Sequence, residues 1–266
     1  MGTIETQPRS VSQTEQWEKC GYQFYLKRVE RVTPRPAAWS HQGTAFHSAA
    51  EAVERSGRTM TEEEAVQLFS DQYSVLVNKS MREEPNLGRW MTAMKKPAGD
   101  DINDRYRMGQ EQVRRYVQWS QANQPSFVTV KNSKGEEKVG LELYFKVELG
   151  GVVVRGYIDQ LPLEPDKSTR VRDLKTGSTK SRFQLETYKV AAEKQWDLKV
   201  YKGDWYQGKK HGLTRPLDLS EVTEEQVAAR YVAMDQGVKA GRFEANPGFD
   251  CGFCDVSHAC SFSRAR

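Results

Sequence analysis

Long hydrophobic runs are absent from this sequence of 266 residues. A transmembrane helix needs roughly 20 consecutive apolar residues, and no stretch approaches that length. The first six residues also lack the basic and apolar pattern of a secretory signal peptide. We therefore expect neither a membrane protein nor a secreted one, but a cytoplasmic protein without membrane contact.

The sequence also lacks a large excess of charge of either sign. The chain has 40 Lys and Arg residues against 36 Asp and Glu residues, which gives a formal net charge of +4. This small charge excludes a histone-like polycation, but it allows a nucleic-acid enzyme with one local basic surface. The phosphate-binding motif G-x-x-x-x-G-K-[ST] is missing, so we expect no fused ATP-driven helicase.

Linkers and internal repeats are missing as well. No Pro-, Gly- or Ser-rich stretch divides the chain, and aromatic residues make up 10% of it, too many for a disordered protein. A chain of this length can bury the core of one large domain. We expect a single domain over residues 1–266, with segments at 10–40, 41–125, 126–210 and 211–266.

Cysteine is rare, and its distribution is informative. Cys20 lies near the N-terminus, whereas Cys251, Cys254 and Cys260 form a C-x2-C-x5-C cluster. A disulfide framework does not suit a chain without secretion signals. Four thiolates suit tetrahedral zinc or an iron–sulfur cluster, and His258 could replace one cysteine at zinc. Spacing does not decide between them, but either metal site would tie the chain ends together.

Helical patterns dominate the first half of the chain. Thr61 and Glu64 form a capping-box pattern, so a helix should begin there. Residues 78–101 are charged and contain two prolines and two glycines, which is typical of an exposed insertion. The expected helices cover residues 12–31, 41–56, 61–77 and 103–122.

Strand patterns follow, separated by turns rich in glycine, proline and asparagine. A helix over 182–195 and a strand near 198–206 come next, and a last helix over 223–241 precedes the cysteine cluster. This order of helices, sheet and helices indicates an α/β or α+β domain. The four strands expected before that helix cover residues 127–130, 140–149, 152–159 and 170–175.

Two carboxylates lie on neighbouring predicted strands. Asp159 ends one strand, and Asp173 and Lys175 lie on the next. Because side chains alternate along a strand, Asp173 and Lys175 should face the same side. Such a pair can hold Mg²⁺ or Mn²⁺, and the lysine can orient a water that attacks a phosphate. An isolated D-x-K is common, however, and also fits an exposed ion pair on a hairpin.

Two further pairs accompany the carboxylates. His47 and Glu51 are four residues apart on one helix, and Gln184 and Tyr188 repeat that spacing on the helix after Lys175. Each pair alone also fits ordinary packing. Their order along the chain, bracketed by cysteines, is more specific than any one motif.

In this order the motifs resemble the RecB-type branch of the PD-(D/E)XK nucleases. More narrowly, they resemble the iron–sulfur exonucleases that are related to CRISPR-associated adaptation nucleases and found in phages. Six weak motifs in the family order span nearly the whole chain. They are Ser10-Val-Ser-Gln with Cys20, Gly43-Thr-Ala-Phe-His47, Gly156-Tyr-Ile-Asp159, Asp173-Leu-Lys-Thr-Gly177, Gln184-Leu-Glu-Thr-Tyr188 and the terminal cysteines.

The resemblance implies a fold and a metal site. The fold would be α/β, with a restriction-endonuclease-like core in which helices flank a mixed sheet. The catalytic Mg²⁺ or Mn²⁺ would be held by His47, Asp159, Asp173 and the backbone carbonyl of Leu174. Two neighbouring acidic residues, Glu51 and Glu142, receive no ligand role.

The resemblance also implies roles for the remaining motif residues. Lys175 would serve the attacking water, and Gln184 and Tyr188 would support the site and the DNA. The four cysteines would bind a 4Fe-4S cluster that joins the N- and C-terminal segments. In the family a proline often follows the first cysteine, whereas this chain has Gly21, which removes no ligand.

Basic residues concentrate just after the catalytic strand, with Trp196, Trp205 and Tyr206 interleaved among them. Basic side chains neutralise phosphates and aromatic rings stack on unpaired bases. A solvated basic face over core aromatics explains the same pattern, and both interpretations stay open. The main candidates for DNA contacts are Lys180, Arg182, Lys189, Lys209 and Lys210.

Together these features predict a metal-dependent deoxyribonuclease, an exonuclease that hydrolyses phosphodiester bonds at linear DNA ends. Its setting would be recombination, repair or phage DNA metabolism in a bacterial or phage-infected cell. The alternatives are a catalytically silent protein that binds DNA ends, a zinc-stapled nucleic-acid-binding module, and a CRISPR-type endonuclease or processing factor. Whether the protein forms a homo-oligomer or works with a recombination partner protein stays open.

Overall fold

The computed structural model describes residues 4–93, 96–177 and 181–264, which form two compact units. Two of the four chain boundaries between the units, 143/144 and 156/157, fall inside the two strands of one hairpin, and the other two, 35/36 and 221/222, fall outside helices and strands. The first unit comprises Met1–Arg35, Tyr144–Gly156 and Val222–Arg266, and the second comprises Pro36–Leu143 and Tyr157–Glu221.

The first unit is built around three helices, α1 (Val11–Lys19), α2 (Gly21–Arg28) and α7 (Glu224–Lys239). The expected continuous helix over 12–31 is wrong, because Cys20 is extended (φ −161°) and separates α1 from α2. Gly21 allows this break to pack closely, since a Cβ there would lie 2.9 Å from the backbone of residues 243 and 244.

A small core and a buried ion pair hold this unit together. Phe24, Met234 and Val238 form the core, and Trp17 packs against it. The fully buried Arg9 donates from Nε and Nη2 to Asp235 Oδ1, at 2.9 and 2.7 Å. A buried guanidinium needs such a carboxylate partner, because an unpaired buried charge is costly.

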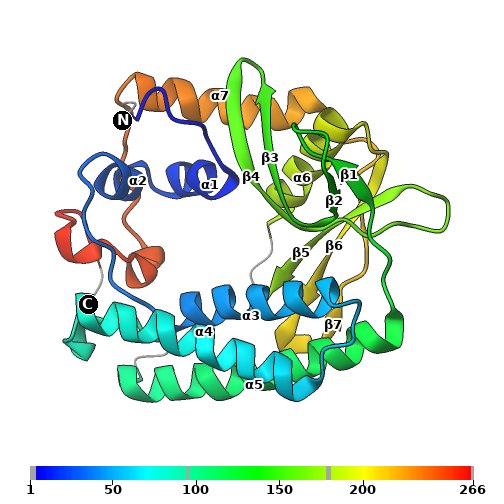
Figure 1. Ribbon diagram of the computed structural model, residues 1–266. Coiled ribbons are helices and arrows are strands. Elements are labelled where there is room, and N and C mark those ends of the chain that lie inside the picture. The colour runs from blue at the N-terminus through cyan, green and yellow to red at the C-terminus, as the bar shows by residue number, and fades with distance from the viewer. Residues whose placement is uncertain (1–3, 94–95, 178–180, 265–266) are drawn as a thin grey trace. The chain divides into compact units, whose positions relative to one another are not determined.

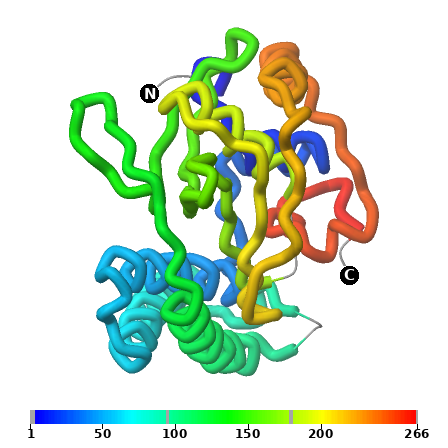
Figure 2. Tube along the Cα trace, turned by 90° about the vertical axis from the view of Figure 1, so that its right-hand side faces the viewer, coloured from blue at the N-terminus to red at the C-terminus, as the bar shows by residue number. Residues whose placement is uncertain are grey.

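The helices of the second unit are α3 (Ala38–Arg55), α4 (Glu62–Glu83) and α5 (Ala98–Asn123), which run alongside one another in both views (Figures 1 and 2). The capping box at Thr61 and Glu64 is present and starts α4, as expected. The helices pack through rings such as Phe46, Phe69 and Tyr116. None of the described helices is both long and apolar enough to cross a membrane.

The expectation of an exposed insertion over 78–101 is wrong for its described residues. α4 continues to Glu83, and a short 3-10 helix, η1 (Leu87–Arg89), follows. Trp90 and Met91 are only 5% and 6% exposed, and Met91 N–H donates to the Pro36 carbonyl. Apolar burial therefore holds this stretch against the helices, while charged residues such as Arg82 and Arg89 face solvent.

The sheet confirms an α/β fold with a mixed sheet flanked by helices. In the described part of the chain β4 and β5 are antiparallel, β5 and β6 are parallel, and α6 (Arg182–Trp196) connects the parallel pair. The strand order is β3-β4-β5-β6-β7, and β8 (Leu217–Asp218) also pairs with β6. These strands are β3 (Leu141–Leu149), β4 (Val152–Gln160), β5 (Thr169–Lys175), β6 (Val200–Gln207) and β7 (Gly212–Leu213).

Outside this sheet, β1 (Thr129–Lys131) and β2 (Glu137–Val139) form a separate antiparallel hairpin. The parallel pairing of β5 with β6 positions the functional residues. Lys175 at the end of β5 is paired with Gln207 at the end of β6. Because parallel strands end at the same sheet edge, the turn after β6 lies at the edge where the D-x-K motif ends.

Candidate active site

The residues expected to hold a metal lie together in the second unit. His47 on α3 approaches the end of β5, with its Nε2 3.0 Å from the Leu174 carbonyl oxygen. Its Nδ1 lies 3.7 Å from Asp159 Oδ2 at the end of β4. The same Asp159 oxygen accepts a hydrogen bond from the Leu174 N–H at 2.7 Å, which fixes β4 against β5.

Glu142 joins this group, although sequence analysis gave it no role. One carboxylate oxygen of Glu142 lies 3.2 Å from His47 Nδ1, and His47, Glu142 and Asp159 offer ligand atoms within 4.8 Å of one another. Glu142 has a positive φ of 46°, which is unusual for a residue with a side chain and often marks a functional site. The residue types around Glu142 carry no signal for this conformation.

These donors fit a divalent cation. His47, Glu142 and Asp159 supply a ring nitrogen and carboxylate oxygens within 4.8 Å of one another, a donor set that divalent cations accept. Asp173 is 1% exposed, and its Oδ2 atom has no hydrogen-bond partner among the described residues. A buried carboxylate oxygen without a partner is costly unless a cation satisfies it.

The electrostatics of the site also favour a cation. Burial by itself lowers the pKa of His47, but Asp159, Glu142 and Asp173 outweigh it and raise that pKa to about 9. Burial and then the charge of Asp159 raise the pKa of Asp173 to about 7, against the opposing effect of Lys175. Burial also raises the pKa of Asp159. Without a metal, the site keeps protons to offset its clustered carboxylates.

Lys175 is fixed by two hydrogen bonds. Its ammonium donates to Asp173 Oδ1 and to Gln184 Oε1, both at 3.0 Å. Gln184 Nε2 in turn donates to the Tyr188 hydroxyl at 2.7 Å, and that hydroxyl lies 3.5 Å from Asp159 Oδ1. Because the Leu174 N–H donates to the same Asp159, these contacts close through the backbone of β5 into a ring that includes the lysine. The i, i+4 spacing of Gln184 and Tyr188 on α6 allows this arrangement.

An open pocket of about 390 Å³ lies beside this ring, along the exposed side of α3. It gives solvent access to His47 and Glu142. Glu51 faces the pocket, but its carboxylate is paired with Arg55 at 2.7 Å. The pocket is lined by Gly43, Thr44, His47, Ser48, Glu51 and Glu142.

The basic residues expected to contact DNA differ in their exposure and in the elements that carry them. Lys209 and Lys210 are exposed in η3 (Gly208–Lys210), directly after β6. Arg182 is exposed at the start of α6, where it donates to Glu186. Lys180 lies outside the described residues.

Two expectations about the basic segment need correction. Lys189 is only 5% exposed and its ammonium is paired with Glu193, so it offers no charge to DNA. Trp205 and Tyr206 are 7% and 0% exposed, so their rings belong to the interior and present no face to bases. β6 is buried along most of its length, which explains why the aromatic residues on it pack inward.

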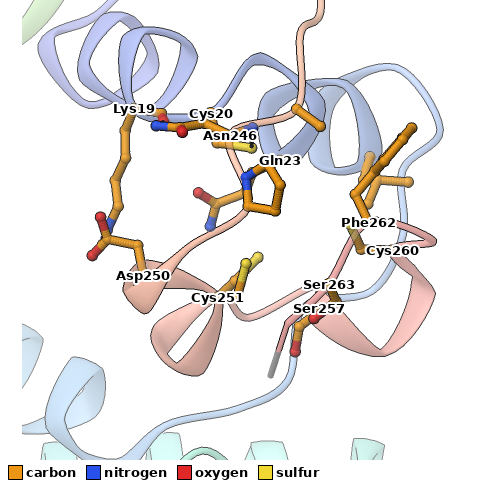
Figure 3. Close-up of a pocket in the computed structure, with 14 residues that line it drawn as sticks. Lys19, Cys20, Gln23, Asn246, Asp250, Cys251, Ser257, Cys260, Phe262 and Ser263 are labelled. Atoms are coloured by element: carbon orange, nitrogen blue, oxygen red, sulfur yellow. Dashed lines mark hydrogen bonds and ion pairs between the residues drawn. The ribbon is translucent and has the colours of Figure 1, made fainter. Parts of the chain in front are cut away.

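All four cysteines line one pocket in the first unit (Figure 3). Cys20 lies at the break between α1 and α2, and the other three come from the C-terminal tail. The exposed His258 is not among the residues that line this pocket. The tail therefore returns to the N-terminal helices, as a shared metal site would require.

Polar contacts support the cysteines and the tail. Asn246 N–H points to Cys20 Sγ at 3.5 Å, and Gly248 N–H points to Cys251 Sγ at 3.4 Å. Hydrogen bonds from the backbone N–H groups of residues 264 and 248 lower the pKa of Cys251, whereas burial raises that of Cys254. Arg35 Nη2 donates to the Cys254 carbonyl at 3.0 Å and secures the loop.

Comparison with known proteins agrees with this geometry. Residues 8–261 match the family model of the PD-(D/E)XK nuclease superfamily. The chain belongs to that superfamily. The superfamily explains why a D-x-K motif ends β5 beside a second aspartate on β4, and its nucleases use divalent metals and bind DNA.

The similar curated proteins come from phages. "Gene 69 protein" of Mycobacterium phage D29 is 37% identical over 98% of this chain and 98% of its own length. "Gene 69 protein" of Mycobacterium phage L5 is 35% identical over 95% of both chains. A solved structure described as "Crystal structure of SSO0001" covers 88% of this chain and 90% of its own, with a TM-score of 0.34 and 10% identity, too low to support an assignment.

Proposed function

We propose that this PD-(D/E)XK protein is an exonuclease that hydrolyses phosphodiester bonds at DNA ends with Mg²⁺ or Mn²⁺. The observation that carries the proposal is the ring formed by Asp159, Asp173, Lys175, Gln184 and Tyr188 next to His47. The phage relatives favour a setting in phage DNA recombination, repair or related DNA metabolism.

The chain provides the ligands for the metal. His47, Asp159, Asp173 and the Leu174 carbonyl would hold it, and Glu142 lies close enough to contribute. When bound, a divalent cation lowers the pKa of a water and neutralises charge that develops on the phosphate. His47 then has to be neutral at one ring nitrogen, and the carboxylates have to be ionised.

Lys175 has the geometry of the residue that positions the attacking water. Two of its three N–H donors are used by Asp173 and Gln184, and its side chain is 26% exposed. The third donor is left for a water or for a phosphate oxygen. Gln184 and Tyr188 hold the ammonium in place and so preorganise this contact.

Exposed cations near the same sheet edge would bind the DNA backbone. Lys209 and Lys210 follow the strand that is paired with the D-x-K strand, and both are exposed. Arg182 starts the helix that carries Gln184 and Tyr188. Contacts from these residues would neutralise phosphates without reading sequence.

The four cysteines are proposed to hold a 4Fe-4S cluster that stabilises the first unit. The four thiols line one pocket, and such a set suits either a cluster or tetrahedral zinc. The likeness of the ordered motifs to iron–sulfur exonucleases is what favours the cluster. Hydrolysis needs no electron transfer, so the cluster would be structural.

The proposed function is tested on labelled linear DNA, single- and double-stranded, with closed circles as the control substrate. We expect freshly purified protein to degrade linear DNA with Mn²⁺ or Mg²⁺ but not with chelator, and to spare the circles. Asp173→Asn should abolish cleavage, whereas Asp71→Asn, at an exposed residue of α4, should cleave like the wild type. Cleavage of circles would indicate an endonuclease, and DNA binding without cleavage would indicate an end-binding protein.

A further inference from the structure

A series of buried amides leads from α3 through α5 to the end of β5. Gln42 and Gln112 are each 1% exposed, and Gln42 Nε2 donates to Gln112 Oε1 at 2.9 Å. Gln112 Nε2 then donates to the carbonyl of Thr176 at 2.9 Å. The amide of Gln112 thus connects two helices to the backbone directly after Lys175.

At the other end of this series of amides, Gln42 is held by a charged side chain. Arg105 Nη1 lies 3.3 Å from Gln42 Oε1, and Arg105 Nε lies 3.3 Å from Asp101 Oδ1. Asp101 is 2% exposed, so this pair is mostly screened from solvent. With its oxygen facing a guanidinium, Gln42 must present its NH₂ group to Gln112, which in turn directs the NH₂ group of Gln112 to the Thr176 carbonyl.

The backbone is therefore held on both sides of Lys175. On one side, the Leu174 N–H donates to Asp159 Oδ2 at 2.7 Å. On the other side, the Thr176 carbonyl accepts from Gln112. Thr176 also lies over α3, since its Oγ1 is 3.9 Å from the position of a Cβ at Gly43. These contacts fix the backbone direction from which the Lys175 side chain departs.

Gln112 contacts the basic turn as well. A Cβ at Gly208 would lie 3.0 Å from Gln112 Cδ and 3.3 Å from its Nε2, so only glycine fits without displacing the amide. Gly208 opens η3, which carries the exposed Lys209 and Lys210. One buried side chain therefore packs between the end of the catalytic strand and the turn proposed to bind DNA.

We propose that Gln112 is a positioning residue that sets the orientation of Lys175 through the Thr176 carbonyl. The inference rests on the proposed catalytic role of Lys175. A displacement of about 1 Å at a reacting group can lower a rate about 100-fold. Loss of the Gln112 amide should therefore lower kcat and leave KM and metal affinity unchanged, because its hydrogen bonds within the described part of the chain go to Gln42 and Thr176 and to none of the proposed metal ligands.

The test compares Gln112→Met, which keeps the volume and removes the amide, with Gln110→Met. Gln110 lies on the same helix but donates to Ser70 on α4. We expect kcat to fall about 10- to 100-fold in the Gln112 variant, with KM and the calorimetric Mn²⁺ affinity at wild-type values. Gln110→Met should keep the wild-type kcat. An unchanged kcat in Gln112→Met, or a fall matched by weaker Mn²⁺ binding, would overturn the inference.

A second readout does not depend on cleavage. In protein labelled with ¹³C at lysine, the Lys175 resonance is assigned by its loss in Lys175→Arg. It should shift in Gln112→Met and in Gly208→Ala, which displaces the amide without removing it, but not in Gln110→Met. A resonance that stays in place in both variants contradicts the inference, even if the wild-type protein cleaves DNA. A shift in a protein that cleaves nothing supports the positioning role and rejects the proposed function.

Discussion

At the residue scale, the site is dominated by carboxylates that are buried close to one another. Asp173 and Asp159 are 1% and 7% exposed, and each raises the cost of ionising the other. The same oxygens that destabilise the metal-free protein would bind the cation. Stability of the apoprotein and affinity for metal should therefore change in opposite directions when one carboxylate is removed.

Asp173→Asn should make the metal-free protein more stable and abolish tight Mn²⁺ binding. The pKa of Asp173 is raised to about 7 in the folded protein, so the folded state holds a proton that the unfolded chain has lost. Its stabilising contribution is present below about pH 4 and disappears as the pH rises through about 7. The advantage of the Asn variant should therefore grow from pH 5 to pH 8.

Thermal unfolding of both proteins with chelator measures this difference. At pH 8 a gain of about 1 kcal/mol would raise Tm by about 2–4 °C for a chain of this size. A variant less stable than the wild type at pH 8 would show that the carboxylates are not in electrostatic conflict.

Glu142→Gln tests the residue that sequence analysis did not assign. The amide keeps the size of Glu142 but removes its charge beside His47. We expect Mn²⁺ affinity to fall about 10-fold, whether Glu142 binds the ion or orients His47. Calorimetry measures this directly. Wild-type affinity in the variant would remove Glu142 from the metal site.

The positions of residues were predictable where local strand geometry determines them, and were not where tertiary packing does. Strand alternation placed Asp173 and Lys175 on one side, and their side chains do meet at 3.0 Å. The approach of Glu142 depends on a backbone with positive φ, which its residue type disfavours. Lys189 was expected to contact DNA, but it lies on a buried part of α6 and pairs with Glu193 instead.

At the scale of elements, local chemistry determines most helix ends. Thr61 and Thr223 each form a capping box that starts a helix, and the one at Thr61 was predicted from its sequence pattern. The break at Cys20 was not readable, because it depends on Gly21 meeting the backbone of the distant C-terminal segment. The burial of Trp90 in the helical core likewise depends on tertiary packing.

Asp235→Asn should destabilise the first unit. The change leaves the guanidinium of the fully buried Arg9 without its anionic partner. We expect a loss of about 3 kcal/mol in the free energy of unfolding, measured by urea denaturation. Asp71→Asn, on an exposed part of α4, serves as the control.

The same ion pair should make the protein acid-sensitive. Burial alone would raise the pKa of Asp235, but Lys239 and Arg9 outweigh it and lower that pKa in the folded protein. The stabilisation is present above the unfolded-state pKa of about 4 and is lost as the pH falls through the folded-state value. Equal acid sensitivity in the wild type and the Asn variant would contradict this role.

At the scale of the whole molecule, the order of motifs predicted the α/β class, because the resemblance that the motifs carry implies a mixed sheet flanked by helices. The division into two units was not predictable from composition. Two of its four boundaries fall at Leu143/Tyr144 and Gly156/Tyr157, inside β3 and β4, where no change of composition marks them.

Cys254→Ser should lower iron content and thermal stability together, if the four thiols hold a cluster that fixes the tail. Iron and sulfide are measured in anaerobically purified protein beside its Tm. Ser257→Ala, which loses one contact with Arg35 in the same loop, is the matched control and should keep its iron. Zinc in place of iron would reject the cluster, and full stability after complete loss of the cluster would reject its structural role.

The central claim is that Lys175 and the metal ligands around it cleave DNA from its ends. The most direct measurement is the rate at which Lys175→Ala removes nucleotides from end-labelled linear DNA in saturating Mn²⁺, beside the wild type and Lys202→Ala, a control at an exposed residue of β6. We predict that the wild type and the Lys202 variant degrade the DNA at the same rate. Lys175→Ala should be slower by about 100-fold or more and still bind Mn²⁺. Equal degradation by Lys175→Ala would contradict the account.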